Sequence, residues 1–188
     1  MQRTTPPFRA DHVGSLLRSE TLKHARADHA AGKIDAAALR QIEDQEIKTL
    51  VAKQEAIGLQ SITDGEFRRA FWHFDFLGGL GGVELFESDA GIQFKGVQTK
   101  ATGVRVVNKL HYTPHVMVDH FKYLKSVTRQ TPKMTIPSPS MLHYRGGRKM
   151  INMGVYPDMN DFYHDLGETY AGAVQDFAKA GCRYLQLD

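Results

Sequence analysis

The sequence predicts an α/β fold in which parallel strands alternate with helices. Short apolar segments with the length of strands occur at residues 8–17, 60–64, 133–136 and 183–187. Helical patterns, with apolar residues three or four positions apart, separate these segments. Polar or turn-forming residues follow each strand segment directly, as expected where a parallel strand ends and a ligand-side loop begins. These observations favour a parallel sheet whose helices serve as crossovers.

Two helices are predicted between the first and second strand segments. Each has a hydroxyl or carboxylate residue at its expected start and a glycine at its expected end, which are the usual capping signals. The first helix is expected between Ser19 and Gly32, and the second between Asp35 and Gly58. The order is therefore strand, helices, strand.

A glycine-punctuated segment at residues 83–112 interrupts this alternation. Its valines Val104, Val106 and Val107 are typical of a returning strand. A β/α unit does not require such a piece, so we interpret it as a hairpin insertion on the ligand side. A hairpin that only covers a sheet edge is the alternative.

Two further helices are predicted in the second half of the chain, at residues 115–127 and 160–180. Their apolar residues fall on one face, as in helices that pack against a sheet. The N-cap of the second helix is expected to be Asn160 or Asp161.

The four strands can belong to an open doubly wound sheet or to part of a (β/α)8 barrel. No G-x-G-x-x-G follows the first strand, which disfavours a dinucleotide-binding sheet. A full barrel needs about 250 residues, whereas this chain has 188 and its fourth strand is its last element. We therefore expect residues 1–188 to be the first four units, the N-terminal half, of a single barrel. Its unclosed sheet edge could support self-association.

The composition excludes several classes of partner. The chain is 41% hydrophobic, has a net charge of +3, and intersperses its basic residues with 21 acidic ones. No nucleic-acid-binding motif occurs, so we expect no nucleic-acid partner. No signal peptide and no apolar run of ~20 residues is found, so we expect a cytoplasmic protein without membrane contact. The single cysteine, Cys182, is expected to be a buried small hydrophobic residue.

Motifs that could bind ligands lie at the predicted strand ends. They are Asp-His-Val-Gly-Ser at 11–15, Thr-Asp-Gly-Glu-Phe-Arg-Arg at 63–69, Ile-Pro-Ser-Pro-Ser at 136–140 and Leu-Gln-Leu-Asp at 185–188. In order and spacing they resemble the catalytic domain of the cobalamin-independent methionine synthase family. The resemblance is strongest to short single-domain members, the 5-methyltetrahydropteroyltriglutamate–homocysteine methyltransferase-like proteins, and runs from about residue 9 to the last residue. It implies a (β/α)8 barrel and a methyltransferase that uses a methyl-folate donor and homocysteine or a similar thiol.

The resemblance also implies roles for individual residues. Gly14 and Ser15 would hold the carboxylate of the amino-acid thiol. Glu66 and Asp188 would hold its amino group, since two carboxylates can clamp one ammonium through charge-assisted hydrogen bonds. Tyr144 lies near the position of a tryptophan that stacks on the pterin in larger members of the family.

Three features modify this expectation. His12 could line the same crevice, with a structural histidine as an equal alternative, and Asp64 replaces the histidine of the family's His-Gly-Glu motif. The resemblance further implies a zinc ion, bound by His, Cys, Glu and Cys, that converts a thiol of pKa ~8.5 into a thiolate. The resemblance implies that these ligands belong to later strands, and the chain has no second cysteine to replace one of them. We therefore predict no metal ligand and no catalytic residue within it. The zinc ligands are expected beyond Asp188.

Two other functions stay open. The first is a related enzyme, either a zinc-dependent alkylation of another thiol or a decarboxylase of the uroporphyrinogen type. In the decarboxylase Arg3, Arg9 and Arg18 would line the crevice. The second is a non-catalytic half-barrel. We expect the 188 residues to be inactive on their own. For the methyltransferase, we expect a small-molecule thiol and a folate-type donor as the ligands of the intact enzyme.

Overall fold

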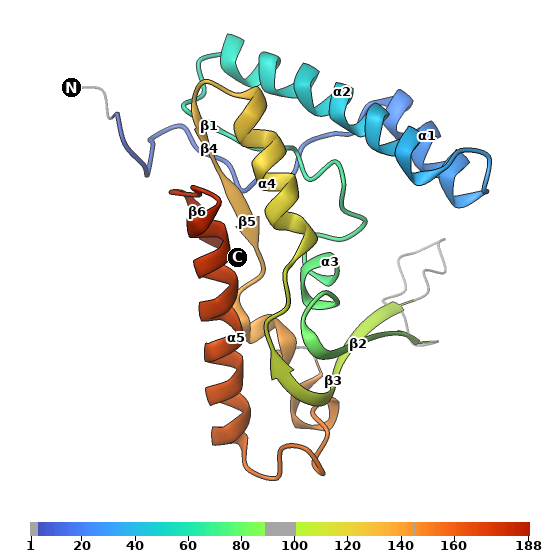
Figure 1. The fold of residues 1–188 in the computed structure, drawn as a ribbon, viewed down its shortest axis with the longest axis vertical. Helices are drawn as coiled ribbons and strands as arrows, with labels where there is room; N and C mark the ends of the chain where they lie inside the picture. The colour runs from blue at the N-terminus through green and yellow to red at the C-terminus, as the bar shows by residue number, and fades with distance from the viewer. Residues whose placement is uncertain (1–3, 89–100, 145) are drawn as a thin grey trace, which may run out of the picture.

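The computed structural model describes residues 4–88, 101–144 and 146–188, which form a mixed α/β structure (Figure 1). Its α-helices are α1 (Glu20–Ala30), α2 (Ala36–Ala56), α3 (Phe74–Leu77), α4 (Val116–Val127) and α5 (Met159–Lys179). Its strands are β1 (Ser61–Ile62), β2 (Gly81–Ser88), β3 (Ala101–His111), β4 (Thr131–Pro132), β5 (Met134–Ile136) and β6 (Leu185–Leu187). Two short 3-10 helices, η1 (Pro139–Leu142) and η2 (Gly147–Met150), follow β5.

Three extended segments run parallel to one another. β1 pairs with β4 and β5 pairs with β6, and both pairs are parallel. β4 and β5 are parts of one segment interrupted at Lys133, whose backbone N–H donates to the carbonyl of Ile62 at 2.8 Å. The strand order is therefore β1, β4–β5, β6, with α4 in the first crossover and α5 in the second. This confirms the predicted parallel pairing of the second, third and fourth strand segments.

The predicted strand at residues 8–17 is wrong, because no strand is present between residues 4 and 19. Side-chain hydrogen bonds hold this segment against the sheet instead, together with one backbone hydrogen bond from the N–H of Leu16 to the carbonyl of Gly65 at 3.1 Å. The Thr63 hydroxyl donates to the carbonyl of Gly14 at 2.8 Å, and the Thr135 hydroxyl donates to the carbonyl of Val13. A ladder needs the backbone of a neighbouring strand, so these contacts fix the segment without making it a strand. The described residues also form no closed barrel.

The capping residues of the first two long helices are as predicted. Ser19 and Asp35 are the N-caps of α1 and α2, and each side chain accepts a hydrogen bond from the backbone N–H three residues later. The prediction for α5 is wrong by two to three residues. Its N-cap is Asp158, which has an extended backbone and accepts from the N–H of Asn160 at 2.9 Å, whereas Asn160 and Asp161 are already helical.

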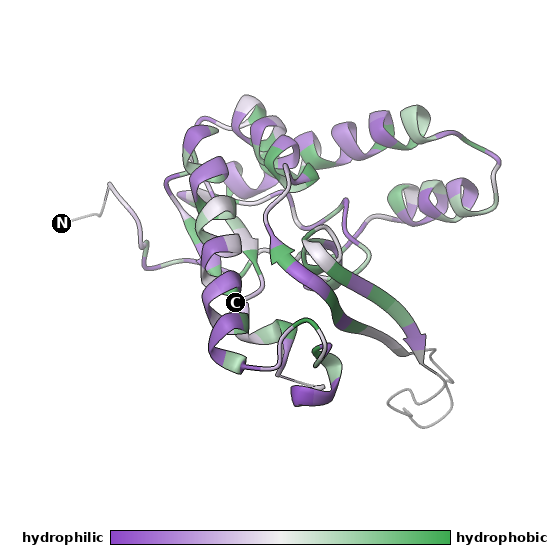
Figure 2. Ribbon diagram, turned by 60° about the horizontal axis from the view of Figure 1, so that its bottom comes forward, coloured by the Kyte–Doolittle hydropathy of each residue, from purple (hydrophilic) through white to green (hydrophobic). Residues whose placement is uncertain are grey.

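The predicted hairpin is present as the antiparallel pair β2 and β3. Residues 89–100, which join the two strands, lie outside the described residues. The hairpin projects away from the parallel strands (Figure 1) and alternates hydrophobic and hydrophilic residues along its length (Figure 2). Val106 of β3 is buried and forms an isolated parallel bridge with Ile151, which ties the base of the hairpin to the segment after η2.

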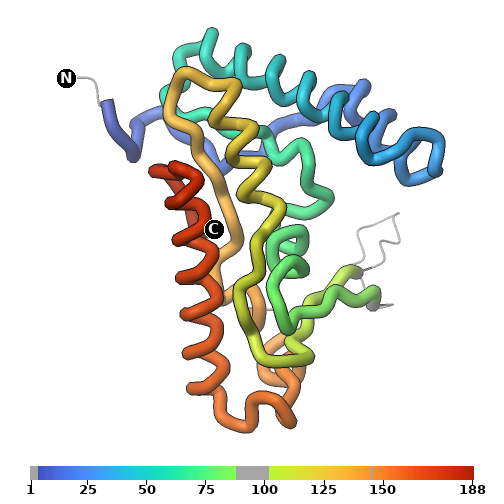
Figure 3. The backbone as a smooth tube through the Cα atoms, in the orientation of Figure 1, coloured from blue at the N-terminus to red at the C-terminus, as the bar shows by residue number. Residues whose placement is uncertain are grey.

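The buried side chains form two apolar clusters. The larger lies among α4, α5, β5 and the base of the hairpin, and includes Phe121, Phe177 and Cys182. The smaller joins α1, α2 and β1 to α4 through Leu22, Ile47 and Leu124. The path of α4 and α5 on either side of β5 can be followed in Figure 3. The burial of Cys182 confirms its predicted role, and none of the described helices is long and apolar enough to span a bilayer.

Candidate functional site

A tight turn follows β1 directly and carries the Asp-Gly-Glu motif. Gly65 and Glu66 have positive φ angles of 67° and 58°. Glu66 donates its N–H to Oδ1 of Asp64 at 2.9 Å, and its carbonyl accepts from the N–H of Arg69 at 3.1 Å. A left-handed backbone costs a non-glycine residue of the order of 1–3 kcal/mol and is typical of functional sites. The turn therefore points to Glu66 as a residue whose placement matters.

The Glu66 side chain is buried at the end of the sheet beside Gly14. Its exposed fraction is 4%, and Oε1 lies 3.4 Å from Nη1 of Arg69. A Cβ placed on Gly14 would lie 3.5 Å from the same Oε1. Two motifs that are far apart in the sequence thus meet at one point of the structure.

Charges around Glu66 act in both directions on its pKa. Burial raises the pKa of Glu66, and the carboxylates of Asp64 and Asp188 raise it further. The guanidinium groups of Arg69 and Arg18 lower it, but the net pKa is raised. The Asp188 carboxylate at the end of β6 is thus one of the charges that raise the pKa of Glu66.

Asp188 is held at the end of β6 by its backbone. Its N–H donates to the carbonyl of Ile136 at 2.9 Å, and its carbonyl accepts from the N–H of Ser138 at 2.5 Å. Its side chain is exposed, and Oδ1 accepts from Nε2 of Gln186 at 3.2 Å. The carboxylate therefore stands at the open end of the parallel strands.

Gly14 and Ser15 lie at the same end of the strands. Gly14 is buried and has a φ of 153°, while Ser15 is exposed. Within the part of the chain that the structure describes, neither backbone N–H donates a hydrogen bond to a protein acceptor. The segment thus presents two N–H donors and a hydroxyl beside Glu66.

The other two predicted site residues lie elsewhere. His12 lines an open groove of about 450 Å³ against α2, together with Leu50 and Leu59. Tyr144 follows η1, and its side chain is exposed. The structure therefore brings together Gly14, Ser15, Glu66 and Asp188, and shows no direct contact of His12 or Tyr144 with Glu66 among the described residues.

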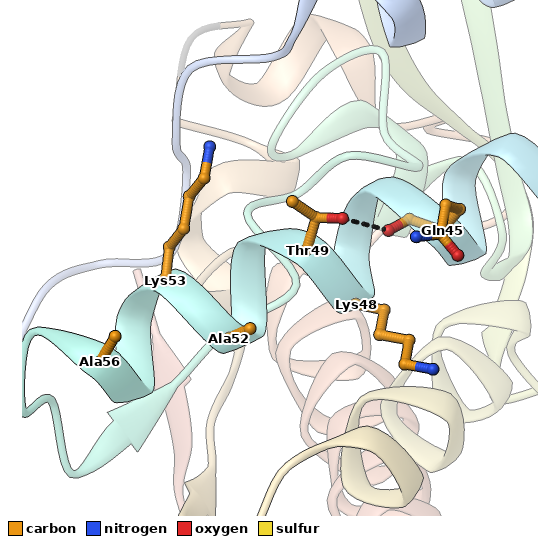
Figure 4. A pocket seen from close by; sticks show the side chains of 6 residues that line it. All are labelled: Gln45, Lys48, Thr49, Ala52, Lys53 and Ala56. Atoms are coloured by element: carbon orange, nitrogen blue, oxygen red, sulfur yellow. Dashed lines mark hydrogen bonds between the residues drawn. The ribbon is translucent and has the colours of Figure 1, made fainter.

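A second groove, of about 460 Å³, lies along α2 and contains none of the predicted site residues (Figure 4). The side chains that line it come from that one helix: Gln45, Lys48, Thr49, Ala52, Lys53 and Ala56. Within this group the Thr49 hydroxyl donates to the backbone carbonyl of Gln45 at 3.0 Å. The shallow face of one helix offers no convergent charges, so we assign it no role.

An ion pair between a buried lysine and an aspartate near the motifs was missed from the sequence. Lys133 is 1% exposed, and its Nζ lies 3.1 Å from both carboxylate oxygens of Asp11. Hydroxyls of Ser61 and Tyr184 also donate to Asp11. Burial raises the pKa of Asp11, but these hydrogen bonds outweigh burial and lower it to about 2. In the predicted strand at residues 133–136, the polar residues Lys133 and Thr135 alternate with apolar ones, and this pattern was the signal that the sequence offered for a buried lysine.

Of the three arginines expected to line the crevice of a decarboxylase, Arg9 and Arg18 lie among the described residues. Arg3 lies outside the described residues, and Arg9 is exposed. Nη2 of Arg18 donates to the carbonyls of Glu66 at 2.9 Å and Arg69 at 2.7 Å. Arg18 is therefore engaged with the turn that carries Glu66.

The residues of this chain do not fit the zinc site that the family resemblance implies. Among the described residues, no three His, Cys, Asp or Glu side chains gather as a metal site would require. Cys182 is buried, and burial raises the pKa of its thiol, which opposes the thiolate that zinc binds. The part of the chain that the structure describes therefore presents no set of side chains matching that zinc site.

Comparison with known proteins decides the family. Residues 8–188 match the family described as the catalytic domain of the cobalamin-independent synthase. The chain belongs to this family. The uncharacterized protein YxjG of Bacillus subtilis is 52% identical over the whole chain, which covers 50% of YxjG. A methionine synthase of Sulfurisphaera tokodaii is 30% identical over 94% of the chain and 50% of its own length.

Solved structures of the synthase family share the fold. The putative vitamin-B12 independent methionine synthase from Listeria monocytogenes is 45% identical, with a TM-score of 0.80 over 97% of this chain and 52% of that one. A B12-independent methionine synthase from Shewanella, solved with selenomethionine, has a TM-score of 0.62 at 18% identity, which supports the fold alone. The chain spans about half the length of the curated relatives it matches most strongly.

Proposed function

We propose that this chain forms the N-terminal half of a (β/α)8 methyltransferase that transfers a methyl group from a 5-methyltetrahydrofolate-type donor to homocysteine. Family membership and the relatives called methionine synthase support the reaction class. The observation that carries the proposal is the buried carboxylate of Glu66, held beside Gly14 and within the electrostatic influence of Asp188.

In this proposal the two carboxylates bind the amino group of the acceptor. Glu66 and Asp188 come from the ends of different strands, and the Asp188 carboxylate raises the electrostatic cost of ionising Glu66. A ligand ammonium placed between them would remove that cost and make charge-assisted hydrogen bonds to both. The raised pKa of Glu66 is thus the property expected of a site that awaits a cation.

The carboxylate of the acceptor would bind on the opposite side, at Gly14 and Ser15. Both backbone N–H groups lack a protein acceptor among the described residues, and the Ser15 side chain is exposed. Backbone N–H groups and a hydroxyl are suitable donors for a carboxylate. An amino acid bound in this way would be fixed at both its charged groups, leaving its side-chain thiol to point at the donor.

The donor and the metal involve other parts of the protein. The exposed ring of Tyr144 offers a surface for stacking against the pterin of the folate, and His12 would contact the substrates from the groove against α2. Zinc would supply thiolate activation, and its ligands would be residues outside this chain. The task of these 188 residues is then to bind and orient the substrates.

One observation favours a second acceptor. Asp64 replaces the histidine of the family motif, and its Oδ2 is buried without a hydrogen bond to any described residue. Such an acceptor could select a thiol other than homocysteine, so the alkylation of a different thiol is the alternative. The decarboxylase alternative loses support because Arg18 is bound to backbone carbonyls.

The proposal is tested by measuring methionine formation from methyl-folate and homocysteine in the presence of zinc. Two preparations are compared: the 188-residue chain alone, and the chain co-expressed with the part of YxjG that it does not match, which we call the completed protein. We expect methionine only from the completed protein. A panel of other thiols identifies the alternative acceptor, and size-exclusion chromatography of the chain alone detects self-association through the open sheet edge. Turnover by neither preparation with any thiol would contradict the proposal.

A further inference from the structure

The turn that carries Glu66 is fastened to the segment that carries Gly14 and Ser15. Nη2 of Arg18 donates to the carbonyl of Glu66 at 2.9 Å and to the carbonyl of Arg69 at 2.7 Å. These carbonyls belong to the first and last residues of the Glu66–Arg69 turn. One nitrogen therefore draws both ends of the turn together and ties them to a residue three positions after Ser15.

This contact compensates for an unfavourable backbone. Glu66 is a non-glycine residue with a φ of 58°, a conformation that persists only where the surroundings hold it. The carbonyl of Glu66 also accepts from the N–H of Arg69 at 3.1 Å, so Arg18 reinforces a turn that has one backbone hydrogen bond across it. The direction of the Glu66 side chain follows from that backbone.

A second arginine contacts the same turn without touching Glu66. Nη1 of Arg26 donates to the carbonyl of Phe67 at 2.9 Å and lies 3.7 Å from Oε1 of Glu43. Arg26 thus binds the middle of the turn and serves as a matched comparison for Arg18. Both are partly buried arginines that bind backbone carbonyls of one turn.

Arg18 also contributes charge. The groups that act electrostatically on the Glu66 carboxylate are Arg69, Asp64, Arg18 and Asp188. The two arginines favour the ionised carboxylate, and the two aspartates oppose it. Burial and the two aspartates raise the pKa of Glu66, and loss of the positive charge at Arg18 would remove one of the groups that lower it.

We propose that Arg18 is a positioning residue for the amino-group subsite: it couples the Gly14–Ser15 segment to the Glu66 turn and helps to keep Glu66 ionised. This inference rests on the proposed function. It extends the subsite to a residue that need not touch the substrate. Arg18 acts on Glu66 in two ways: through hydrogen bonding to its backbone carbonyl and through the electrostatic effect of the guanidinium charge.

The test uses the completed protein with Arg18→Met, Arg18→Lys and Arg26→Met. We expect Arg18→Met to raise the KM for homocysteine about tenfold, as for the loss of a charge-assisted hydrogen bond, with a smaller change in kcat. The acid limb of kcat/KM should move to higher pH, because the pKa of Glu66 rises without the cation. Arg18→Lys keeps the charge, so the acid limb should stay in place while KM recovers in part. Arg26→Met should change neither quantity as much as Arg18→Met.

A purely structural role for Arg18 would give a different pattern. Wild-type KM and pH profile in Arg18→Met, or equal shifts in Arg26→Met, would overturn the inference. Thermal unfolding checks that each variant folds. If Arg18→Met does not fold, Arg18→Lys is compared with Arg26→Lys. Equal KM values for these two variants would overturn the inference. If Glu66→Gln leaves homocysteine affinity unchanged, the proposed function itself fails. If Glu66→Gln weakens binding and Arg18→Met does not, only this inference fails.

Discussion

Oε1 of Glu66 lies 3.4 Å from Nη1 of Arg69, and both side chains are almost fully buried at the end of β1. Burying two charges is costly unless further polar groups satisfy them. Arg69 meets this need in part, since it also donates to the carbonyl of Trp72 at 3.4 Å and to Sδ of Met134 at 3.5 Å. The arrangement holds a carboxylate in place next to Gly14, where an apolar residue would pack at lower cost.

Gly14→Ala should weaken both stability and acceptor binding. The φ of 153° at Gly14 strains any residue with a Cβ, and the new methyl group would lie 3.5 Å from Oε1 of Glu66. We expect a loss of about 1–3 kcal/mol in the free energy of unfolding. Urea unfolding of the chain measures the stability, and calorimetric titration of the completed protein with homocysteine measures the affinity.

A matched control is Gly167→Ala in the exposed part of α5. Apart from its chain neighbours and the backbone of its own helix, no described atom lies within 4 Å of a Cβ at Gly167. The substitution should therefore stabilise the helix by about 0.5–1 kcal/mol and leave homocysteine affinity unchanged. Equal behaviour of the two alanine variants would refute the special role of Gly14.

Asp11 should make the fold sensitive to strong acid. Its pKa is lowered to about 2 in the folded chain because the hydrogen bonds from Tyr184, Ser61 and Lys133 outweigh burial. A carboxylate whose pKa falls on folding stabilises the fold above its unfolded pKa of about 4, and this contribution is lost as the pH falls through the folded value. Asp11→Asn should lower the free energy of unfolding at neutral pH. It should also reduce the loss of that free energy between pH values of about 4 and about 2, which are the unfolded and folded pKa values of Asp11.

The measurement is urea unfolding of wild type and Asp11→Asn across that acid range. Asp28→Asn, which removes a carboxylate from the exposed surface of α1, controls for the general loss of charge. If Asp11→Asn and wild type lose stability in parallel as the pH falls, the Lys133–Asp11 pair does not carry the acid sensitivity.

The single thiol should be unreactive in the folded chain. Cys182 is 7% exposed, and burial raises its pKa, so little thiolate is available to a reagent. We expect slow alkylation by iodoacetamide in buffer and fast alkylation in denaturant, followed by mass spectrometry. Fast labelling of the folded chain would show that the cluster between α5 and β6 is open.

Local chemistry explains which parts of the fold the sequence predicts. Ser19 and Asp35 are found as caps because a capping side chain acts on the backbone only a few residues away. The cap of α5 was misplaced because Asp158, Asn160 and Asp161 all carry suitable oxygens, and backbone geometry selects among them. The segment at 8–17 was mistaken for a strand because its partners, including Thr135, are side chains distant in the sequence.

The candidate site was predictable to a similar extent. The motifs identify Glu66 and Gly14, and the family resemblance implies that both bind one substrate, but periodicity alone does not place Oε1 of Glu66 beside Gly14. Arg18 and Lys133 were missed as supporting residues because their roles depend on contacts across 48 residues or more. Contacts of that range are decided by packing, which periodicity does not report.

The proposal that Glu66 and Asp188 hold one ammonium is tested most directly by a double-mutant cycle. In the completed protein, homocysteine is titrated into three variants: Glu66→Gln, Asp188→Asn and the double variant. The control is Glu84→Gln, which removes the carboxylate that pairs with Arg105 on the exposed hairpin. Each single variant should weaken binding about tenfold or more, and the double variant should weaken it by clearly less than the product of the two. Unchanged affinity in Glu66→Gln, or two fully independent effects, would contradict the shared amino-group site.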